Sequence, residues 1–424
     1  MKLQTPVRLT VGVFLLALCG TMTHQPLPVQ AQSFPEVSSG SQSGSERATS
    51  LVPSLRIAER YDSNVFFVPG TKLEDYVTTI SPNLKLAHKN QWLEGTIGGG
   101  ATGEVYVNNP GLNYVGGNGS IELNLDRVMN ALLPGLRLNL SDNIRYTPEP
   151  PAFAAPTSGN QISEAFVQGL QARRANSFTN SAKVEASYFF SQSMGLTSTY
   201  TDRRMRFGRA IGTQTGVAGG EFIKTNFQTL TSGLIGRLSE ADTISLLHQY
   251  QKAAFPSLGR EFSTQGAMAR WSRLITATLQ ATVEGGFNVI SSSNDVKPIG
   301  AASLQWHGQY TSLHLAYSRA VVPSMLFAST PLLSQSVTGG VSRKLSESLS
   351  LSLSGSYAVN ESVPDSSLLR FESYRVMPSL DYKISQTLTS TLSYTHSEFT
   401  RSLTGRSAEF DRNMVMLSLT AEWN

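Results

Sequence analysis

The glycine-rich run at residues 98–103 is the one stretch of this sequence that formally fits a cofactor-binding motif. Glycines with this spacing cradle the pyrophosphate of a dinucleotide when they follow a strand and open a helix. Here the run lies inside a segment that keeps the alternation of a strand through Ile97, Val105 and Val107. We therefore expect these glycines to allow curvature or close packing within a strand, and we expect no cofactor.

Nucleophiles and metal ligands are also sparse. The only cysteine, Cys19, lies in the N-terminal segment, and the Gly-x-Ser-x-Gly motif of serine esterases does not occur. The histidines outside that segment lack the paired spacing of metal ligands; they are His88, His248, His307, His314 and His396. We expect no catalytic residue, no metal site and no enzymatic activity, although a Ser, a His and an acid brought together from separate strands stays open.

Four oxygen-bearing side chains around the first expected loop could bind calcium. They are Asp62 and Asn64 before the loop, and Glu74 and Asp75 after it. Asp and Asn also stabilise turns, because their side chains accept hydrogen bonds from nearby backbone N–H groups. We favour the turn interpretation for these residues.

The first 31 residues have the features of a cleaved signal peptide. Lys2 and Arg8 precede an apolar run at residues 11–19, and Val29 and Ala31 stand where a signal peptidase reads small residues, so we place cleavage after Ala31. Residues 32–50 are rich in Ser and Gly and should form a flexible periplasmic segment. No later stretch reaches the roughly 20 apolar residues of a membrane helix. The exported chain is therefore periplasmic, secreted or an outer-membrane β-barrel.

The composition argues against several classes of protein. Charged residues make up 15% of the 424 residues, below the roughly 25% of an ordinary soluble domain. The net charge of +4 and the isoelectric point of about 9.1 describe a small imbalance, so a nucleic-acid partner is not expected. The mean hydropathy of −0.13 is too low for a helical membrane protein.

Period-two alternation runs through the sequence from about Leu55. Residues 275–287 and 349–357 each alternate apolar side chains with Thr, Ser or other polar ones, which is the pattern of a strand. About ten such residues match one tilted strand across a membrane. We predict an all-β fold over residues 51–424: a transmembrane antiparallel up-and-down β-barrel of about 18 strands, with 16 as the next choice.

Connection lengths alternate in the same way. Short turns are expected near residues 89–90, 191–192, 239–242, 307–309, 346–348 and 385–386. Longer loops are expected at residues 147–174, 208–221, 291–297, 321–330, 361–367 and 397–409. Short periplasmic turns and longer extracellular loops are typical of bacterial outer-membrane barrels.

Aromatic residues recur near one end of the expected strands. They are Tyr200, Tyr250, Phe287, Tyr317, Tyr357 and Tyr394, and they predict an aromatic girdle at the membrane interface. Ordinary strand enrichment in aromatics is the alternative. The last strand presents Leu417, Leu419 and Trp423 on one face, which looks like the terminal signal recognised by the barrel assembly machinery.

The face opposite the apolar one should line a water-filled interior. Its expected charged members are Glu94, Glu104, Glu122, Lys183, Glu185, Arg203, Glu284 and Glu422; they could filter permeants or only solvate the interior. In the longest loop, Arg173 and Arg174 could stand at a constriction or pack on the loop crown. Arg203, Arg204, Arg206 and Arg209 could meet anionic lipopolysaccharide, an anionic polymer, or the lipid headgroups at the rim.

Residues 60–66, read RYDSNVF, carry a family resemblance. They are similar to the first strand and loop of outer-membrane proteins of the putative β-barrel porin type, which are found with exopolysaccharide export systems. Pro82, Tyr374, Pro378 and Tyr382 resemble the strand patterns of that family. The resemblance implies a cell outer-membrane location, a channel for hydrated solute or polysaccharide, and periplasmic export components as partners. A structural or adhesive barrel with partner-binding loops and no open pore is the alternative.

Overall fold

The computed structural model describes residues 48–65, 72–147, 174–211, 224–323, 331–363, 369–403 and 406–423. The expected signal peptide at residues 1–31, most of the segment expected at residues 32–50, and Arg173 lie outside these ranges. No helix within the described ranges is long and apolar enough to cross a membrane.

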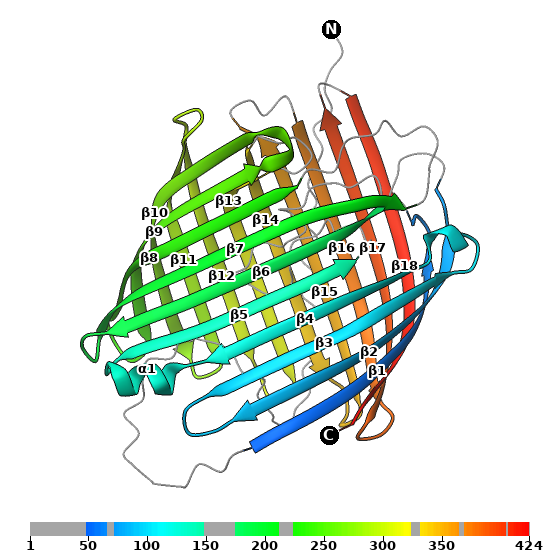
Figure 1. Ribbon diagram of the computed structural model, residues 1–424, viewed down its shortest axis with the longest axis horizontal. Coiled ribbons are helices and arrows are strands. Elements are labelled where there is room, and N and C mark those ends of the chain that lie inside the picture. Colours follow the sequence, from blue (N-terminus) through cyan, green and yellow to red (C-terminus); the bar gives the residue numbers. More distant parts are fainter. Residues whose placement is uncertain are drawn as a thin grey trace.

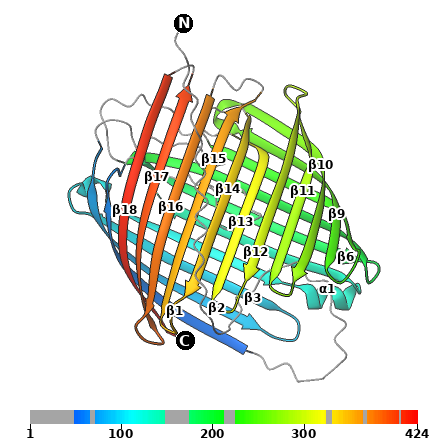
Figure 2. The ribbon, with the colours of Figure 1, turned by 180° about the vertical axis from the view of Figure 1, so that it is seen from behind.

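Eighteen strands form one antiparallel sheet that closes on itself, because β1 pairs with β18 as well as with β2 (Figures 1 and 2). This confirms the predicted barrel and its strand number. The strands are β1 Ala48–Asp62, β2 Asp75–Lys89, β3 Glu94–Tyr106, β4 Tyr114–Asn124, β5 Leu136–Thr147, β6 Arg174–Phe189, β7 Met194–Ile211, β8 Thr225–Arg237, β9 Asp242–Phe255, β10 Arg260–Thr276, β11 Leu279–Ile290, β12 Val296–His307, β13 Thr311–Pro323, β14 Pro331–Lys344, β15 Leu349–Ser362, β16 Leu369–Lys383, β17 Leu388–Leu403 and β18 Arg406–Glu422.

The two ends of the barrel differ in their connections. At the end where even-numbered strands finish, which we name the turn end, most connections are short, including residues 90–93, 190–193 and 345–348. The helix α1 (Asp126–Leu132) joins β4 to β5 at this end, where the C-terminus also lies (Figure 1). The opposite end, named the loop end, carries longer connections such as residues 148–173 and 212–224, and two single-turn 3-10 helices, Pro110–Leu112 and Pro256–Leu258.

Two expectations about the connections are wrong. Residues 397–409, expected as a loop, belong almost entirely to β17 and β18, which pair up to Leu403 and Arg406. Residues 275–287, expected as one strand, contain the turn between β10 and β11 at residues 277–278. β1 also begins at Ala48, inside the segment expected to be flexible.

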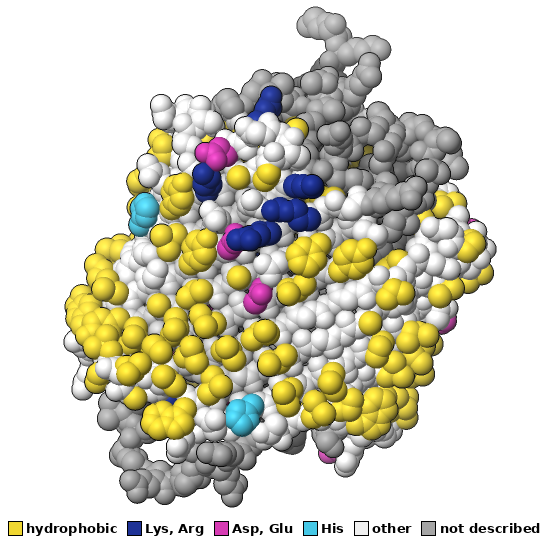
Figure 3. Space-filling model, in the orientation of Figure 1, with side chains coloured by type: hydrophobic (Ala, Val, Ile, Leu, Met, Phe, Trp, Pro, Cys, Tyr) yellow, Lys and Arg dark blue, Asp and Glu magenta, His cyan; other side chains and the backbone are white. Residues whose placement is uncertain are grey.

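Over most of its height the barrel is apolar outside and polar inside. On β11, Val283 and Phe287 point outward and are 51% and 47% exposed, whereas the inward Asn288 is only 1% exposed. The six aromatic residues expected as a girdle are all exposed on the outer face of odd-numbered strands; they are Tyr200, Tyr250, Phe287, Tyr317, Tyr357 and Tyr394. In one view, apolar side chains cover the lower part of the outer face and charged ones gather above them (Figure 3).

Beyond the girdle, toward the loop end, this pattern is inverted. The largest buried cluster lies on the inner side of β13 to β18, and consists of Val322, Leu332, Leu369, Phe371, Phe399 and Phe410. A second cluster, Ala253, Phe255 and Phe262, lies inside β9 and β10. The outer face at the same level carries charged residues such as Arg370, Glu372 and Glu398. The hydrophobic core therefore sits inside the loop end, and the outer wall there is built for a polar environment.

Close approach between strands requires glycine at specific wall positions. A Cβ on Gly286 of β11 would stand 2.1 Å from the carbonyl oxygen of Ala267 and 2.7 Å from the Cα of Met268, both on β10. A Cβ on its neighbour Gly285 would have no atom within 4 Å. The glycine run at residues 98–103 lies inside β3, as expected, and a Cβ on Gly100 would collide with Asn83 and Pro82 of β2.

Candidate functional site

The charged residues expected in the interior lie on the inner wall of the barrel. All eight charged residues expected there alternate with outward neighbours and lie on the inner side of β3, β4, β6, β7, β11 and β18; they are Glu94, Glu104, Glu122, Lys183, Glu185, Arg203, Glu284 and Glu422. They are spread around the wall and do not form one constellation. They would therefore act on a permeant through the electrostatic field of the whole wall, and not as one binding pocket.

Several of these side chains have ionic partners on the same wall. Lys183 Nζ lies 2.6 Å from Glu185 Oε1 on the same strand. Arg270 on β10 donates from Nε to Glu284 Oε2 on β11 over 2.6 Å. Lys89 Nζ and Glu94 Oε2 are 3.0 Å apart at the turn end. Pairing of this kind keeps both signs of charge in the interior while limiting the net field.

Glu104 belongs to a more buried arrangement. Its side chain is 4% exposed and its Oε2 lies 3.2 Å from Nη2 of Arg60 on β1. The Tyr106 hydroxyl donates to the same oxygen over 2.7 Å. Sequence reasoning missed Arg60 and Arg270 as partners, because cross-strand neighbours follow from the register of the strands, which alternation alone does not give.

The inner wall of β13 to β15 has a different chemistry. Its inner positions are dominated by hydroxyl groups, including Ser312, Ser318, Ser334, Ser336, Thr338, Ser342, Ser350, Ser352, Ser354 and Ser356. The Ser318 and Ser336 hydroxyls are 2.8 Å apart, and that of Ser352 is 2.6 Å from Ser379 on β16. Among the described inner side chains of these three strands, only His314 and Lys344 can ionise. We name this face the hydroxyl sector.

The expected constriction is only partly described. Arg173 lies outside the described residues, and Arg174 is the first residue of β6, opposite Ile211 of β7, with its side chain outside the described set. Of the arginines expected near the rim, Arg203 faces inward, whereas Arg204 and Arg206 face outward. The side chain of Arg209 also lies outside the described set.

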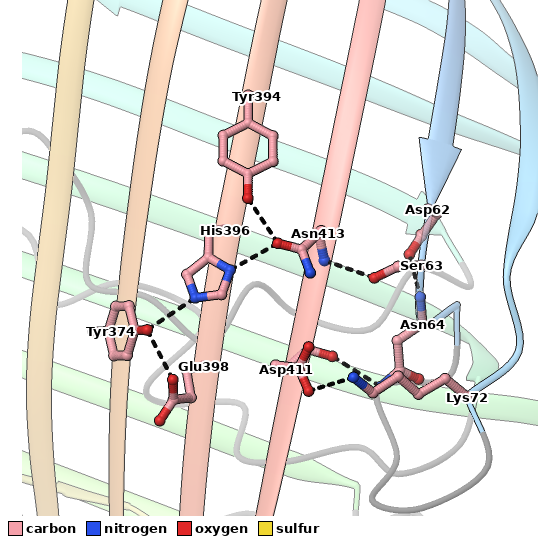
Figure 4. Close-up of polar contacts among 10 residues, drawn as sticks. All are labelled: Asp62, Ser63, Asn64, Lys72, Tyr374, Tyr394, His396, Glu398, Asp411 and Asn413. Carbon is pink, nitrogen blue, oxygen red and sulfur yellow. Dashed lines mark hydrogen bonds and ion pairs between the residues drawn. The ribbon is translucent and has the colours of Figure 1, made fainter.

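Residues 60–65 take part in the closure of the barrel between β1 and β18. Asp62 is fully buried and accepts a hydrogen bond over 2.9 Å from Nε of Arg412 on β18, with a second contact from Arg412 Nη2. Ser63 N–H donates to the carbonyl oxygen of Asn413 over 3.0 Å, and its Oγ accepts from Asn413 N–H over 2.8 Å (Figure 4). Asn64 Nδ2 donates to the Asp411 carbonyl oxygen over 3.0 Å, and Asn64 N–H donates to Asp62 Oδ1.

The oxygen-bearing residues considered for calcium therefore have hydrogen-bond partners within the protein. Asp75 accepts from the N–H groups of Tyr76 and Asn108 and from Asn109 Nδ2, which ties the β3–β4 connection to β2. Glu74 accepts from the Tyr61 hydroxyl over 2.8 Å. Within the described ranges, no group of three or more His, Cys, Asp and Glu side chains could hold a metal ion. The bond from Asn64 N–H to Asp62 Oδ1 is of the turn type, whereas Arg412 reaches Asp62 from β18 and Asn108 and Asn109 reach Asp75 from the β3–β4 connection.

A polar network lies on the outer side of β16 to β18, next to this closure (Figure 4). The Tyr374 hydroxyl donates to Glu398 Oε2 over 2.8 Å and lies 2.9 Å from His396 Nε2. His396 Nδ1 lies 2.8 Å from Asn413 Oδ1, which also accepts from the Tyr394 hydroxyl over 2.7 Å. Tyr374 and Tyr394 thus each combine an outward ring with a hydroxyl bonded to a polar partner, as suits an interface.

The expected assembly signal is exposed on the outer face. Leu417, Leu419 and Trp423 are about half exposed, and Trp423 N–H donates to the Pro53 carbonyl oxygen over 3.1 Å. That bond extends the β1–β18 pairing past the last residue of β18.

Comparison with known proteins gives a family match over the C-terminal part of the chain. Residues 296–423 match the family model of putative beta-barrel porin 2. This is consistent with a β-barrel porin. The matched stretch runs from β12 to the end of β18 and includes Tyr374, Pro378 and Tyr382, whereas the closure sequence at residues 60–66 lies outside it.

The solved structures that this chain resembles include three from Pseudomonas aeruginosa. The siderophore receptor PirA is 10% identical with a TM-score of 0.45, covering 88% of this chain and 80% of that one. OccK1 (OpdK) is 9% identical with a TM-score of 0.44, covering 88% and 99%, and OccK2 (OpdF) is 9% identical with a TM-score of 0.47, covering 88% and 98%. No curated protein matches the chain in sequence.

Proposed function

We propose that this chain is an outer-membrane channel that passes hydrated solute or polysaccharide, as part of an exopolysaccharide secretion system. The observation that carries the channel is the closed sheet of eighteen strands with an apolar outside and a polar inside. Closure leaves no unpaired backbone edge in lipid. Barrels of 16 to 18 strands are wide enough to enclose an aqueous channel, because side chains do not reach across.

The inner wall supports a hydrated, polyhydroxylated permeant. Along the hydroxyl sector, Ser and Thr side chains can exchange hydrogen bonds with water or sugar hydroxyls at little net cost. The paired charges elsewhere on the wall, such as Arg270 with Glu284, oppose tight binding of an ion of either sign. A weakly interacting wall lets a long polymer slide, whereas strong sites would hold it.

The location and partners belong to the same proposal. Removal of residues 1–31 would deliver the chain to the periplasm, and the barrel assembly machinery would recognise Leu417, Leu419 and Trp423 on the last strand. Lipopolysaccharide would surround the loop end, and periplasmic export components would meet the turn end. The exopolysaccharide role rests on the resemblance of residues 60–66 and of the β16 pattern to porin-type proteins of export systems.

A structural or adhesive barrel without an open pore is the second candidate. The observation that favours it is the buried apolar cluster of Phe371, Phe399 and Phe410 on the inner side of the loop end. Aromatic side chains packed inside the loop end favour an interior filled by side chains over a water-filled one.

Single-channel recording in planar bilayers separates the two. We expect stable openings from refolded protein, and a reversible decrease of current when a neutral oligosaccharide is added. Absence of openings from protein that shows heat-modifiable gel migration, and is therefore folded, would favour the structural role. Openings whose current no oligosaccharide changes would support a channel for small solutes. They would contradict the proposal that the channel passes polysaccharide.

A further inference from the structure

Basic side chains gather on the outer face of β7 and β8, above the aromatic girdle. Arg204 and Arg206 point outward on β7, and the exposed Lys224 immediately precedes Thr225, the first residue of β8, which pairs with Met205. We name these three residues the basic patch. Figure 3 shows basic side chains gathered above the apolar part of this face.

Arg206 is held against the wall by backbone and side-chain acceptors. Its Nη1 donates to the carbonyl oxygens of Met205 and Thr225, over 2.9 and 3.3 Å, and its Nη2 donates to Asn226 Oδ1 over 2.8 Å. A guanidinium has five N–H donors in a fixed plane. These three bonds fix the plane of the group and leave donors for an anion.

Arg204 is oriented by an acid on its own strand. Its Nε and Nη2 lie 2.9 and 2.7 Å from Asp202 Oδ2. Its side chain is nevertheless 59% exposed, and that of Asp202 only 14%. Asp202 compensates one of the three basic charges, so two positive charges remain on the patch. Further along the same face, Lys252 is neutralised by Glu261 at 2.9 Å and adds no net charge.

The level of the patch matches that of lipid headgroups. Arg204 lies four residues beyond the girdle residue Tyr200 on the same face of β7. With a rise of about 3.3 Å per residue and a tilt of about 40°, Arg204 stands about 10 Å above that ring. Aromatic girdles mark the interface, so the patch lies within or just above the headgroup layer. This step rests on the proposed membrane location and not on conduction.

The opposite side of the barrel has the opposite charge. β17 is nine strands from β8 in the ring of eighteen. The outer face around β17 carries Glu361, Glu372, Glu398 and Asp411, with Arg370 paired to Glu361 over 2.8 Å and to Glu372 over 2.6 Å. The described outer rim around β17 therefore carries net negative charge, in contrast to the basic patch.

We propose that Arg204, Arg206 and Lys224 bind a phosphate group of an anionic glycolipid in the outer leaflet. Guanidinium groups suit this ligand, because they donate paired hydrogen bonds to phosphate oxygens. Asn226, opposite Arg204 in the register and bonded to Arg206, joins the two arginines into one site.

The test measures lipid retention by native mass spectrometry of the folded full chain. The probes are lipid A carrying its phosphates and the same lipid with its phosphates removed, each presented in phosphatidylcholine nanodiscs. We expect the phosphorylated lipid to bind about tenfold more tightly, as charge-assisted hydrogen bonds predict. Equal retention of the two lipids would overturn the proposal.

Charge-removing variants locate the site. The double variant Arg204→Gln/Lys224→Gln changes two exposed side chains, and Arg206→Gln tests the held arginine separately, in case its loss disturbs the wall. We expect each to lose most of the preference for phosphate. The matched control, Lys72→Gln/Arg370→Gln, removes two basic charges from the opposite side and should keep it; an equal loss in the control would overturn the assignment.

Free phosphate distinguishes the source of the ligand. Inorganic phosphate should compete with lipid A only at concentrations far above that of the lipid, because it lacks the acyl chains that the apolar face below the patch contacts. Competition at equal concentration would show a soluble-anion site and overturn the lipid assignment. Conductance recorded from the same variants should not change, so a failed channel and a failed lipid site give different results.

Discussion

Arg412 on β18 and Asp62 on β1 form an ion pair across the line where the first and last strands meet, with Arg412 Nε 2.9 Å from Asp62 Oδ1. The two residues are 350 positions apart in the sequence and both point inward. Asp62 is fully buried. The contact exists only when the barrel is closed, so it reports on closure.

Removing one partner of this pair should destabilise the barrel strongly. Asp62→Ala leaves the Arg412 guanidinium without its buried carboxylate, and loss of one buried partner costs about 3–5 kcal/mol. Urea unfolding in lipid vesicles, followed by tryptophan fluorescence, measures the change. Lys72→Ala, which removes the exposed contact with Asp411, is the control and should cost at most about 1 kcal/mol. Equal effects of the two variants would contradict a special role for the closure pair.

Adjacent glycines on β11 should respond very differently to alanine. Gly286→Ala places a methyl group against the backbone of Ala267 and Met268, so β10 and β11 must separate. We expect a loss of about 1–3 kcal/mol, typical of overpacking. Gly285→Ala meets no atom within 4 Å and should be neutral or slightly stabilising. A similar unfolding midpoint for the two variants would show that the wall is not tightly packed at this point.

Charge removal on the inner wall should change ion selectivity. Glu284→Gln leaves Arg270 without its partner at 2.6 Å. The anion-to-cation permeability ratio should rise by up to about fivefold, since unit charges about 4 Å apart in water interact by about 1 kcal/mol. Reversal potentials across a salt gradient measure the ratio. Glu59→Gln, on the outer face and bonded to Thr78, should leave it unchanged.

The apolar cluster inside the loop end should contribute to stability. The Phe399 ring, only 1% exposed, lies 5.6 Å from the centroids of both Phe371 and Phe410. Phe399→Ala should cost about 3–5 kcal/mol, as for other buried aromatics. Phe287→Ala removes a ring from the outer face and should cost less. Unfolding in vesicles compares them, and equal costs would mean that the cluster is not packed in the membrane-bound protein.

Trp423 should matter for assembly more than for stability. Its ring is about half exposed on the outer face, so Trp423→Ala removes little packing. We expect a marked decrease in folded barrel in cells, measured by heat-modifiable migration of outer-membrane fractions. Refolding of the purified variant into detergent should proceed as for the unchanged chain; if refolding fails as well, Trp423 is a structural residue and not a recognition signal.

The sequence predicts the strands well where one face meets lipid and the other meets water. On β11 the outward Val283, Gly285 and Phe287 alternate with the inward Glu284, Gly286 and Asn288, which is the period-two pattern of a strand. It fails at residues 277–278, because the register pairs Leu274 with Gln280. Odd positions face outward on β10 up to a register shift between Leu274 and Thr276, and they face outward again on β11, so the sequence alternates across the turn without a visible break. Ala277 and Thr278 carry no turn signature either.

The incorrect prediction of a loop at residues 397–409 has a different physical cause. Beyond the girdle, outward positions such as Glu398, Glu409 and Asp411 are polar, and apolar Phe399 and Phe410 point inward. A polar stretch at the end of an apolar strand resembles a loop when the outer face is expected to be apolar throughout. The ionic partners of the inner wall were missed for a related reason, since Arg60 and Glu104 meet only through strands that alternation does not align.

The reversal of sidedness above the girdle also determines how deep the barrel can sit. If the barrel sank toward the turn end, Arg204 and Glu372 would enter hydrocarbon, and if it rose toward the loop end, Phe287 and Val415 at the level of the girdle would enter water. Either displacement costs several kcal/mol for each charge or large side chain that is misplaced. The strands themselves therefore set how deep the barrel lies in the membrane. They also set the height of each surface loop above the lipid.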